Sequence, residues 1–306
     1  MLGAHLMTPV VYSAFFSSAE PQYSTPGISD GAIQQGYTYF EGKNVFLHSG
    51  YMVDGSASRI YIVDASDTDN VRYVSLATAD GQPYDGHAGG IAAYGNFVWL
   101  AKSSGDDCLW RIDADSLLSC ENGDVLVLDT PFYVDCTASF CHVDENFVWV
   151  GEFMSKDESS DYEFKTADGS TNNGLILGYG REDAEALDAD TPSIAYSIRY
   201  NVQGMATYDG HVVLSTSWAI NTSHLLFYST LSDTAVLNSV NIDGKSVPLI
   251  ILDESNLVSY VPMQPMAEEI VAKDGKIYVA FESASKKYIF GHFTRGIRVY
   301  AYQYGE

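Results

Sequence analysis

Residues 203–218 read QGMATYDGHVVLSTSW, and residues 89–102 read GGIAAYGNFVWLAK. Each stretch contains a short apolar segment, a turn in which glycine stands beside aspartate or asparagine, and a second apolar segment. This order predicts two antiparallel strands joined by a tight turn. The same pattern recurs in three further stretches, which begin at Gln35, Ser139 and Glu268.

Further strand-like segments follow these hairpins at regular spacing. A third segment follows each hairpin, and a fourth can be drawn in four repeats, at 71–78, 124–130, 193–200 and 238–252. Four strands in every 50 to 65 residues are typical of the blade of a β-propeller. The sequence therefore predicts an all-β, five-bladed β-propeller that forms one domain over 1–306, with blades at about 31–80, 86–134, 135–200, 201–262 and 263–306.

The two ends of the chain suit a closed ring. The last repeat stops at its third strand, and the strand-like segment Val10–Phe16 precedes the first repeat. We expect this segment to supply the outer strand of the last blade, because closure removes a free sheet edge. The polar stretch 152–174 is longer than a hairpin needs and is expected to form an exposed loop between the second and third strands of its blade.

The charge of the chain limits the partners that it can have. It contains 40 Asp and Glu against 16 Lys and Arg, a net charge of −24, which repels nucleic acid and anionic membranes. No apolar run approaches the roughly 20 residues of a membrane span, and the start lacks the basic segment of a signal peptide. We expect a secreted or cell-surface monomer whose leader is absent from this chain. Its expected partner is a small molecule, glycan or peptide.

Four cysteines fall as two close pairs. Their spacing contains no CxxC motif, and the histidines do not complete a zinc pattern. We expect the disulfides Cys108–Cys120 and Cys136–Cys141, as in exported proteins, with free buried thiols as the alternative.

The repeats also predict which residues line the central channel, because the first strand of each blade lies there. One level of the ring holds Gln35, Gly89, Ser139, Gln203 and Glu268, and the next holds Gly36, Gly90, Phe140, Gly204 and Glu269. A carboxylate beside a narrow axis needs a partner, water or a cation. Glu268 and Glu269 are therefore candidate ligands of calcium, and a water-filled polar channel is the alternative. Gln35, Ser139 and Gln203 are candidate ligand-binding residues.

Two further residues are expected near a mouth of the channel. His87 enters the second blade two residues before the ring and, with Glu269, could act as a general acid–base pair. Trp218 ends a second strand and could form an aromatic surface for a sugar or peptide. A structural turn for His87 and core packing for Trp218 are the alternatives.

The blade motifs GHAGGIAAYGNFVWLA and VQGMATYDGHVVLSTSW resemble those of exported bacterial β-propellers of the quinoprotein-like superfamily. In architecture the chain is similar to the five-bladed glutaminyl cyclases of the plant and bacterial type, and IQQGY at Ile33–Tyr37 resembles their F-T-Q-G-L motif. Their Glu-Gly and Trp-Gly pairs correspond here to Gly89–Gly90 and Gln203–Gly204. The resemblance therefore implies the fold without that family's catalytic motifs.

Three functions remain open from the sequence. The chain could be a binding module that uses one mouth of the channel, or a propeller with a purely structural role. It could also be an axial-site enzyme of the lyase, hydrolase or cyclotransferase type, with or without calcium.

Overall fold

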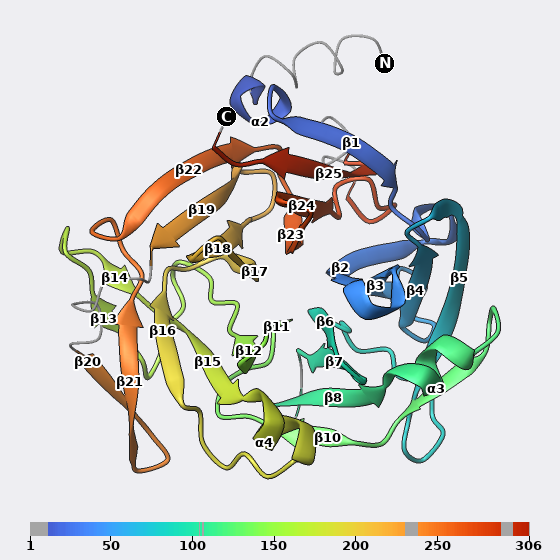
Figure 1. Cartoon of the computed structure of the whole chain (residues 1–306), viewed down its shortest axis with the longest axis horizontal. Coiled ribbons are helices and arrows are strands. Elements are labelled where there is room, and N and C mark those ends of the chain that lie inside the picture. Colours follow the sequence, from blue (N-terminus) through green and yellow to red (C-terminus); the bar gives the residue numbers. More distant parts are fainter. Residues whose placement is uncertain (1–11, 104, 106, 230–237, 289–295, 306) are drawn as a thin grey trace.

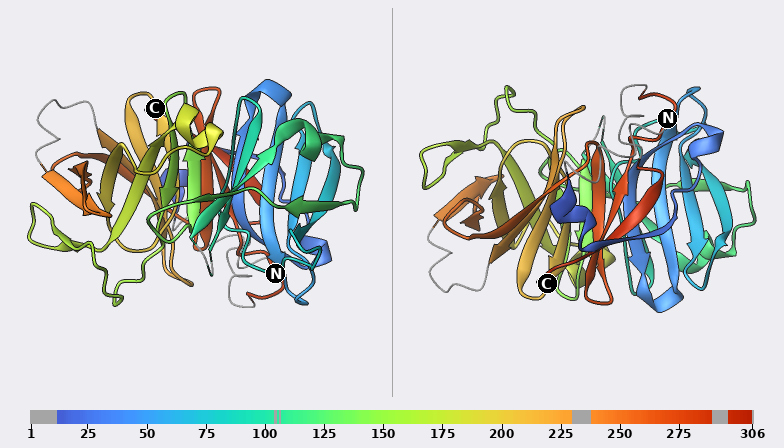
Figure 2. Two further views of the ribbon diagram at one scale, coloured as in Figure 1. Left: turned by 90° about the horizontal axis from the view of Figure 1, so that it is seen from below. Right: turned by 90° about the horizontal axis from the view of Figure 1, so that it is seen from above.

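Five sheets stand like the blades of a fan around a central channel (Figure 1). The structure is a computed structural model, and it describes residues 12–103, 105, 107–229, 238–288 and 296–305. Seen from the side, the blades form a flat disc (Figure 2). The predicted all-β, five-bladed propeller is confirmed.

Each blade is an antiparallel sheet whose first strand lies at the channel. The first blade contains β2 (Ala32–Phe40), β3 (Val45–Met52), β4 (Arg59–Asp64) and β5 (Asp67–Thr78). The second contains β6 (Ile91–Tyr94), β7 (Phe97–Lys102), β8 (Cys108–Asp113) and β10 (Pro131–Tyr133). The third contains β11 (Phe140–Val143), β12 (Phe147–Gly151), β15 (Gly174–Gly180) and β16 (Ile194–Ile198). The fourth contains β17 (Val202–Tyr208), β18 (His211–Thr216), β19 (Ser223–Ser229) and β22 (Leu257–Met263).

The fifth blade closes the ring with a strand from the start of the chain. It contains β23 (Ala267–Lys273), β24 (Lys276–Phe281), β25 (Arg298–Gln303) and, at its outer edge, β1 (Ala19–Ser24). Closure by an N-terminal strand is confirmed, but its assignment to Val10–Phe16 is wrong. Val10 and Val11 lie outside the described residues, and Ser13–Phe16 forms the short helix α2.

The physical reason for this error lies in the edge position of β1. An outer strand is half-exposed, so it tolerates polar residues and a proline, here Pro21, and loses the apolar pattern that identifies inner strands. The apolar residues ahead of it have another role. Phe15 is fully buried beneath the last blade and stacks on Tyr302, with ring centroids 5.8 Å apart.

Two segments predicted as fourth strands instead join the neighbouring blade. β9 (Val125–Leu128) pairs in parallel with β5 of the first blade, although it precedes the outer strand of the second. The hairpin of β20 (Asn238–Ile242) and β21 (Lys245–Ile251) extends the third blade through a parallel pairing with β16. Backbone hydrogen bonds thus tie adjacent blades at the rim.

The remaining elements lie outside the blades. The long loop after β12 contains the small hairpin β13 (Phe164–Lys165) and β14 (Thr171–Asn172), between the second and third strands as expected. Helices α3 (Ala114–Ser119) and α4 (Arg181–Ala186) follow the third strands of their blades, and the 3-10 turns η1 (Ile28–Asp30) and η2 (Glu41–Lys43) flank β2. Within the described residues, no helix has the length and apolar character needed to cross a membrane.

None of the four cysteines takes part in a disulfide, so the expected Cys108–Cys120 and Cys136–Cys141 bonds are not formed. Cys108 starts β8, whereas Cys120 follows helix α3 beyond the other end of that strand. Cys136 and Cys141 are both buried, but their Sγ atoms contact different carbonyls, 3.9 Å from Val150 O and 3.6 Å from Trp99 O. Closeness in the sequence therefore did not bring either pair of sulfurs together.

The buried Glu269 carboxylate lies where the inner strands of the blades meet. Oε2 accepts hydrogen bonds from the backbone N–H groups of Tyr37 at 2.9 Å and Ile91 at 2.7 Å, and Oε1 accepts one from Cys141 at 3.2 Å. These donors belong to the first three blades, while Glu269 itself belongs to the fifth. Burial raises the pKa of Glu269, and the three backbone N–H donors, which favour the ionised form, oppose that rise.

Glycines of the ring make room for this carboxylate. A Cβ atom on Gly90 would lie 2.5 Å from Glu269 Oε1, and one on Gly204, in the fourth blade, would lie 2.7 Å from Glu269 Cα. Both distances are shorter than real Cβ contacts. All five blades therefore meet at this one side chain.

We predict that Glu269→Gln destabilises the fold by roughly 2–4 kcal/mol, because the amide offers one acceptor oxygen and turns an N–H₂ donor towards backbone donors. Urea unfolding followed by fluorescence measures this change. The matched control is Glu41→Gln, an exposed carboxylate in a hairpin turn, which should shift stability by less than about 0.5 kcal/mol. Equal effects of the two substitutions would contradict the role of Glu269.

Candidate functional site

Each end of the channel opens into a cavity. The upper mouth is the end where the first strands begin and the second strands finish, and its cavity has a volume of about 510 Å³. The lower mouth is the end that carries the turns between first and second strands, and its cavity has a volume of about 680 Å³. Glu269 separates the two.

β-Bulges in three inner strands supply polar side chains to the upper mouth. Gln35 and Gln203 are each skipped in the pairing of their strands with the neighbouring second strand. In β23, Glu268 and Glu269 together occupy the space opposite one residue of β24. A bulge redirects a side chain out of the sheet, and Gln35, Gln203 and Glu268 all line the cavity.

The most unusual group at this mouth is a pair of carboxyls. Glu268 is only 3% exposed, and no N–H or hydroxyl group of the described residues donates to its Oε1. Its carboxyl is hydrogen-bonded to that of Glu282, which follows β24. Glu282 Oε2 also accepts a hydrogen bond from Gln35 Nε2 at 3.1 Å, and Tyr288 bonds to the same carboxyl.

Two carboxyls in hydrogen-bond contact cannot both be ionised, so one proton must lie between them. Burial, followed by the proximity of Glu282, raises the pKa of Glu268 well above its usual range. Burial raises the pKa of Glu282 to about 7, while its hydrogen bonds and the nearby Lys287 oppose the rise. Both shifts favour a pair of carboxyls that holds a proton over a pair that is fully ionised.

A second set of side chains forms the rim beside this pair. The Lys287 ammonium lies 2.5 Å from the Tyr51 hydroxyl and over the Tyr51 ring, 4.9 Å from its centroid. The exposed His87 packs against the same ring, with centroids 4.7 Å apart. Partial burial and the charge of Lys287 lower the pKa of His87.

An aromatic pair forms another wall. Trp218 stacks on Phe153, with ring centroids 5.9 Å apart and planes 21° from parallel, and Trp218 is 47% exposed. The backbone is strained nearby, because Ala219 and Met266 adopt positive φ angles of 50° and 66°. Such strain in residues other than glycine gathers at functional sites more often than elsewhere.

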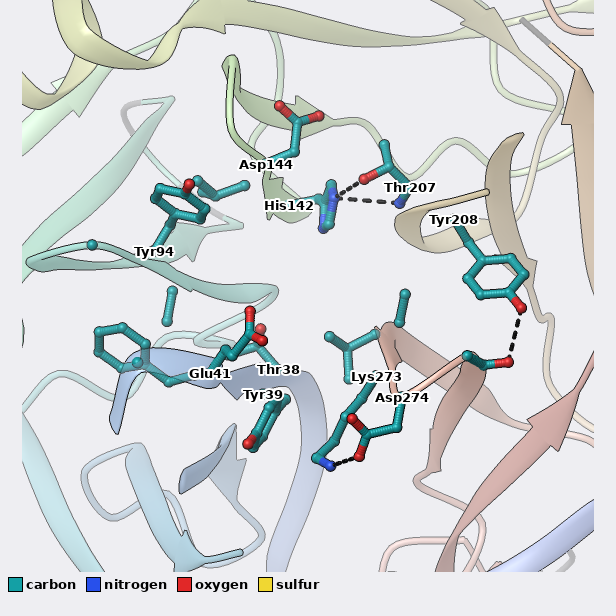
Figure 3. A pocket seen from close by; sticks show the side chains of 18 residues that line it. Thr38, Tyr39, Glu41, Tyr94, His142, Asp144, Thr207, Tyr208, Lys273 and Asp274 are labelled. Carbon is teal, nitrogen blue, oxygen red and sulfur yellow. Dashed lines mark hydrogen bonds and ion pairs between the residues drawn. The ribbon is translucent and has the colours of Figure 1, made fainter. Parts of the chain in front are cut away.

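The lower mouth is lined mainly by groups that satisfy one another (Figure 3). His142 Nε2 accepts a hydrogen bond from the Thr207 N–H at 3.3 Å and contacts the Thr207 hydroxyl at 3.0 Å. Burial lowers the pKa of His142 to about 4. Asp144 accepts the Trp149 indole N–H at 2.7 Å and two backbone N–H groups. This mouth is therefore the weaker candidate.

Most of the residues singled out from the sequence come together at the upper mouth, whose lining includes Gln35, His87, Ser139, Gln203, Trp218 and Glu268. Glu269 does not join them, because its carboxylate is bound by three backbone N–H groups below. Across the described part of the chain, no group of three or more His, Cys, Asp and Glu side chains gathers as a metal site would require.

Sequence reasoning missed Glu282, Lys287 and Tyr288. Glu282 directly follows the second strand of the last blade, and the alignment of Glu268 with Gln203 places it opposite Ser217, next to Trp218. The repeat alignment could therefore have identified it. Lys287 and Tyr288 follow β24, outside the hairpin pattern by which the repeats were aligned.

Comparisons with known proteins agree with the fold. No protein-family model and no curated protein sequence matches the chain. The chain is similar to the glutaminyl cyclase of Myxococcus xanthus, with 10% identity, coverage of 92% of this chain and 94% of that one, and a TM-score of 0.50. It is also similar to the PQQ-bound aldose sugar dehydrogenase of Streptomyces coelicolor, with 13% identity, coverage of 94% and 98%, and a TM-score of 0.52. These similarities support the β-propeller fold.

We predict that the stability difference between wild type and Glu282→Gln depends on pH. A carboxyl whose pKa is raised in the folded state stabilises the fold fully below its unfolded pKa, near 4.5, and loses that contribution as the pH rises through about 7. Wild type should therefore lose stability relative to the variant between pH 4.5 and 7.5. Urea midpoints at pH steps measure this, and a difference that does not change with pH would contradict the shared proton.

Proposed function

We propose that the chain is a binding propeller that holds a small molecule, a glycan end or a short peptide at the upper mouth. The observation that carries this proposal is that amide, hydroxyl, carboxyl and imidazole side chains line one cavity of about 510 Å³ together with the aromatic pair Phe153 and Trp218. That volume is within the range of small-molecule sites. Side chains from all five blades contribute to it, so the rigid ring fixes their spacing.

The chemistry of the lining supports a polar ligand with a flat or apolar part. The amides of Gln35 and Gln203 and the hydroxyl of Ser139 can both donate and accept hydrogen bonds. The exposed Trp218 face offers a stacking surface for a sugar ring or a peptide side chain. These are the groups that orient a ligand.

A second candidate function, acid–base catalysis at the same mouth, is favoured by the Glu268–Glu282 pair. A catalytic group works best with a pKa near the working pH, and the pKa of Glu282 is about 7. The hydrogen bond between the two carboxyls disfavours a two-carboxylate glycosidase, which separates these groups by roughly 5–9.5 Å. A pair that shares a proton instead suits activation of a water molecule.

The binding proposal is tested with thermal shifts against a panel of mono- and disaccharides and dipeptides. We expect a saturable rise in the unfolding temperature with at least one class. Trp218→Ala should weaken that binding roughly tenfold, because it removes the stacking surface. Tyr133→Ala is the matched control, since Tyr133 is 64% exposed on the outer rim. Equal losses in both variants would contradict binding at the upper mouth.

The catalytic candidate makes a different prediction for Glu282→Gln. Ligands that bind are incubated with wild type, and products are followed by mass spectrometry. If the pair is catalytic, the variant should lose turnover at least 100-fold, a loss well beyond any loss of binding. Binding without any product in wild type would leave the chain a binding module alone.

A further inference from the structure

We propose that the ligand of the upper mouth carries an ammonium group, which takes the place of the proton between Glu268 and Glu282, while a flat apolar part of the ligand packs on Trp218. This inference rests on the proposed binding function and specifies its ligand class. It follows from an unsatisfied carboxyl oxygen, a carboxyl–carboxyl contact and an aromatic wall in one cavity.

The carboxyl–carboxyl contact demands a positively charged or proton-bearing partner. Glu268 lies 3% exposed at the cavity wall, and its Oε1 receives no N–H or hydroxyl donor from the described residues. Its hydrogen bond to Glu282 needs a proton between the two groups. An ammonium offers three N–H donors and can bond to both carboxylates at once.

The cavity suits an organic cation better than a metal ion. Calcium takes six to eight oxygen ligands, but Glu269, the next carboxylate, already accepts three backbone N–H groups. Within the described residues, no group of three or more His, Cys, Asp and Glu side chains gathers at this mouth. Two carboxyls, by contrast, suffice to bind one ammonium group.

The aromatic pair gives the rest of such a ligand a place to pack. Trp218 is stacked on Phe153 on one side and is 47% exposed. Stacking fixes the orientation of the indole, so little side-chain entropy is lost on binding. Its face attracts both apolar groups and the partly positive CH₂ next to an ammonium.

Binding must release a proton, because the charge on the pair changes. A ligand R–NH₃⁺ meets a pair that holds one shared proton, the proton leaves to solvent, and the ammonium lies between two carboxylates. The charged or titratable groups that face the pair are Glu269, Lys287 and Tyr288. The Lys287 ammonium is held by the Tyr51 hydroxyl at 2.5 Å and lies over that ring, so it does not fill the place.

The test uses benzylamine, its neutral isostere benzyl alcohol, methylamine and Ca²⁺ as probes, with isothermal titration calorimetry at pH 6.5 in two buffers of different ionisation enthalpy. We expect benzylamine to bind at least tenfold more tightly than benzyl alcohol and to release a proton. Glu268→Gln should abolish the preference for benzylamine over benzyl alcohol. Trp218→Ala should weaken the binding of benzylamine but not that of methylamine. Glu41→Gln, at the lower mouth, is the matched control.

The outcomes distinguish a failure of the ammonium inference from a failure of the proposed binding function. Equal binding of the amine and the alcohol, binding without proton release, or an unchanged preference in Glu268→Gln would overturn the ammonium inference and leave the binding function standing. Ca²⁺ binding tighter than benzylamine would also overturn it, in favour of a metal. If neither these probes nor the saccharides and dipeptides shift the wild type, the proposed function fails as well.

Discussion

The structure depends on one buried carboxylate that is shared among blades. Five sheets that meet at an axis leave backbone N–H groups of their inner strands pointing into the channel, where water has little room. Glu269 satisfies three of these groups, from the first three blades, with the two oxygens of one side chain. Removing it would leave those donors unpaired in the centre of the molecule, at a cost comparable to a large fraction of the stability of a domain.

The adjacent residue, Glu268, has the opposite environment and a different role. Both carboxyls are buried, but Glu269 accepts three N–H donors whereas Oε1 of Glu268 receives none from the described residues. The bulge in β23 makes this division possible, because it fits two residues where a regular strand would hold one. The axial carboxylate thus joins the inner strands, and the carboxyl of Glu268, together with that of Glu282, lines the upper mouth.

The inner ring was predictable from sequence because it repeats. Gln35, Ser139, Gln203 and Glu268 were aligned by the hairpin pattern, and the structure places all four at one mouth. The positions of the outer strands could not be predicted from the sequence, because they depend on pairing between segments far apart in the chain. β9 and β21 have ordinary strand sequences, and only the fold decides that they join the neighbouring blade. The edge strand β1, with its proline, lacks an apolar pattern, and Cys136 and Cys141, five residues apart, remain separate thiols. The role of Glu282 needed the three-dimensional contact with Glu268.

The central claim, that Glu269 unites the blades, is tested most directly by native-state hydrogen exchange of the Tyr37, Ile91 and Cys141 amides. If all three donate to the axial carboxylate, they should exchange only through global unfolding, with protection equal to the full free energy of unfolding. They should lose that protection together when Glu269 is replaced by Gln. Rapid exchange of these amides in wild type, or unequal losses in the variant, would contradict a shared axial anchor.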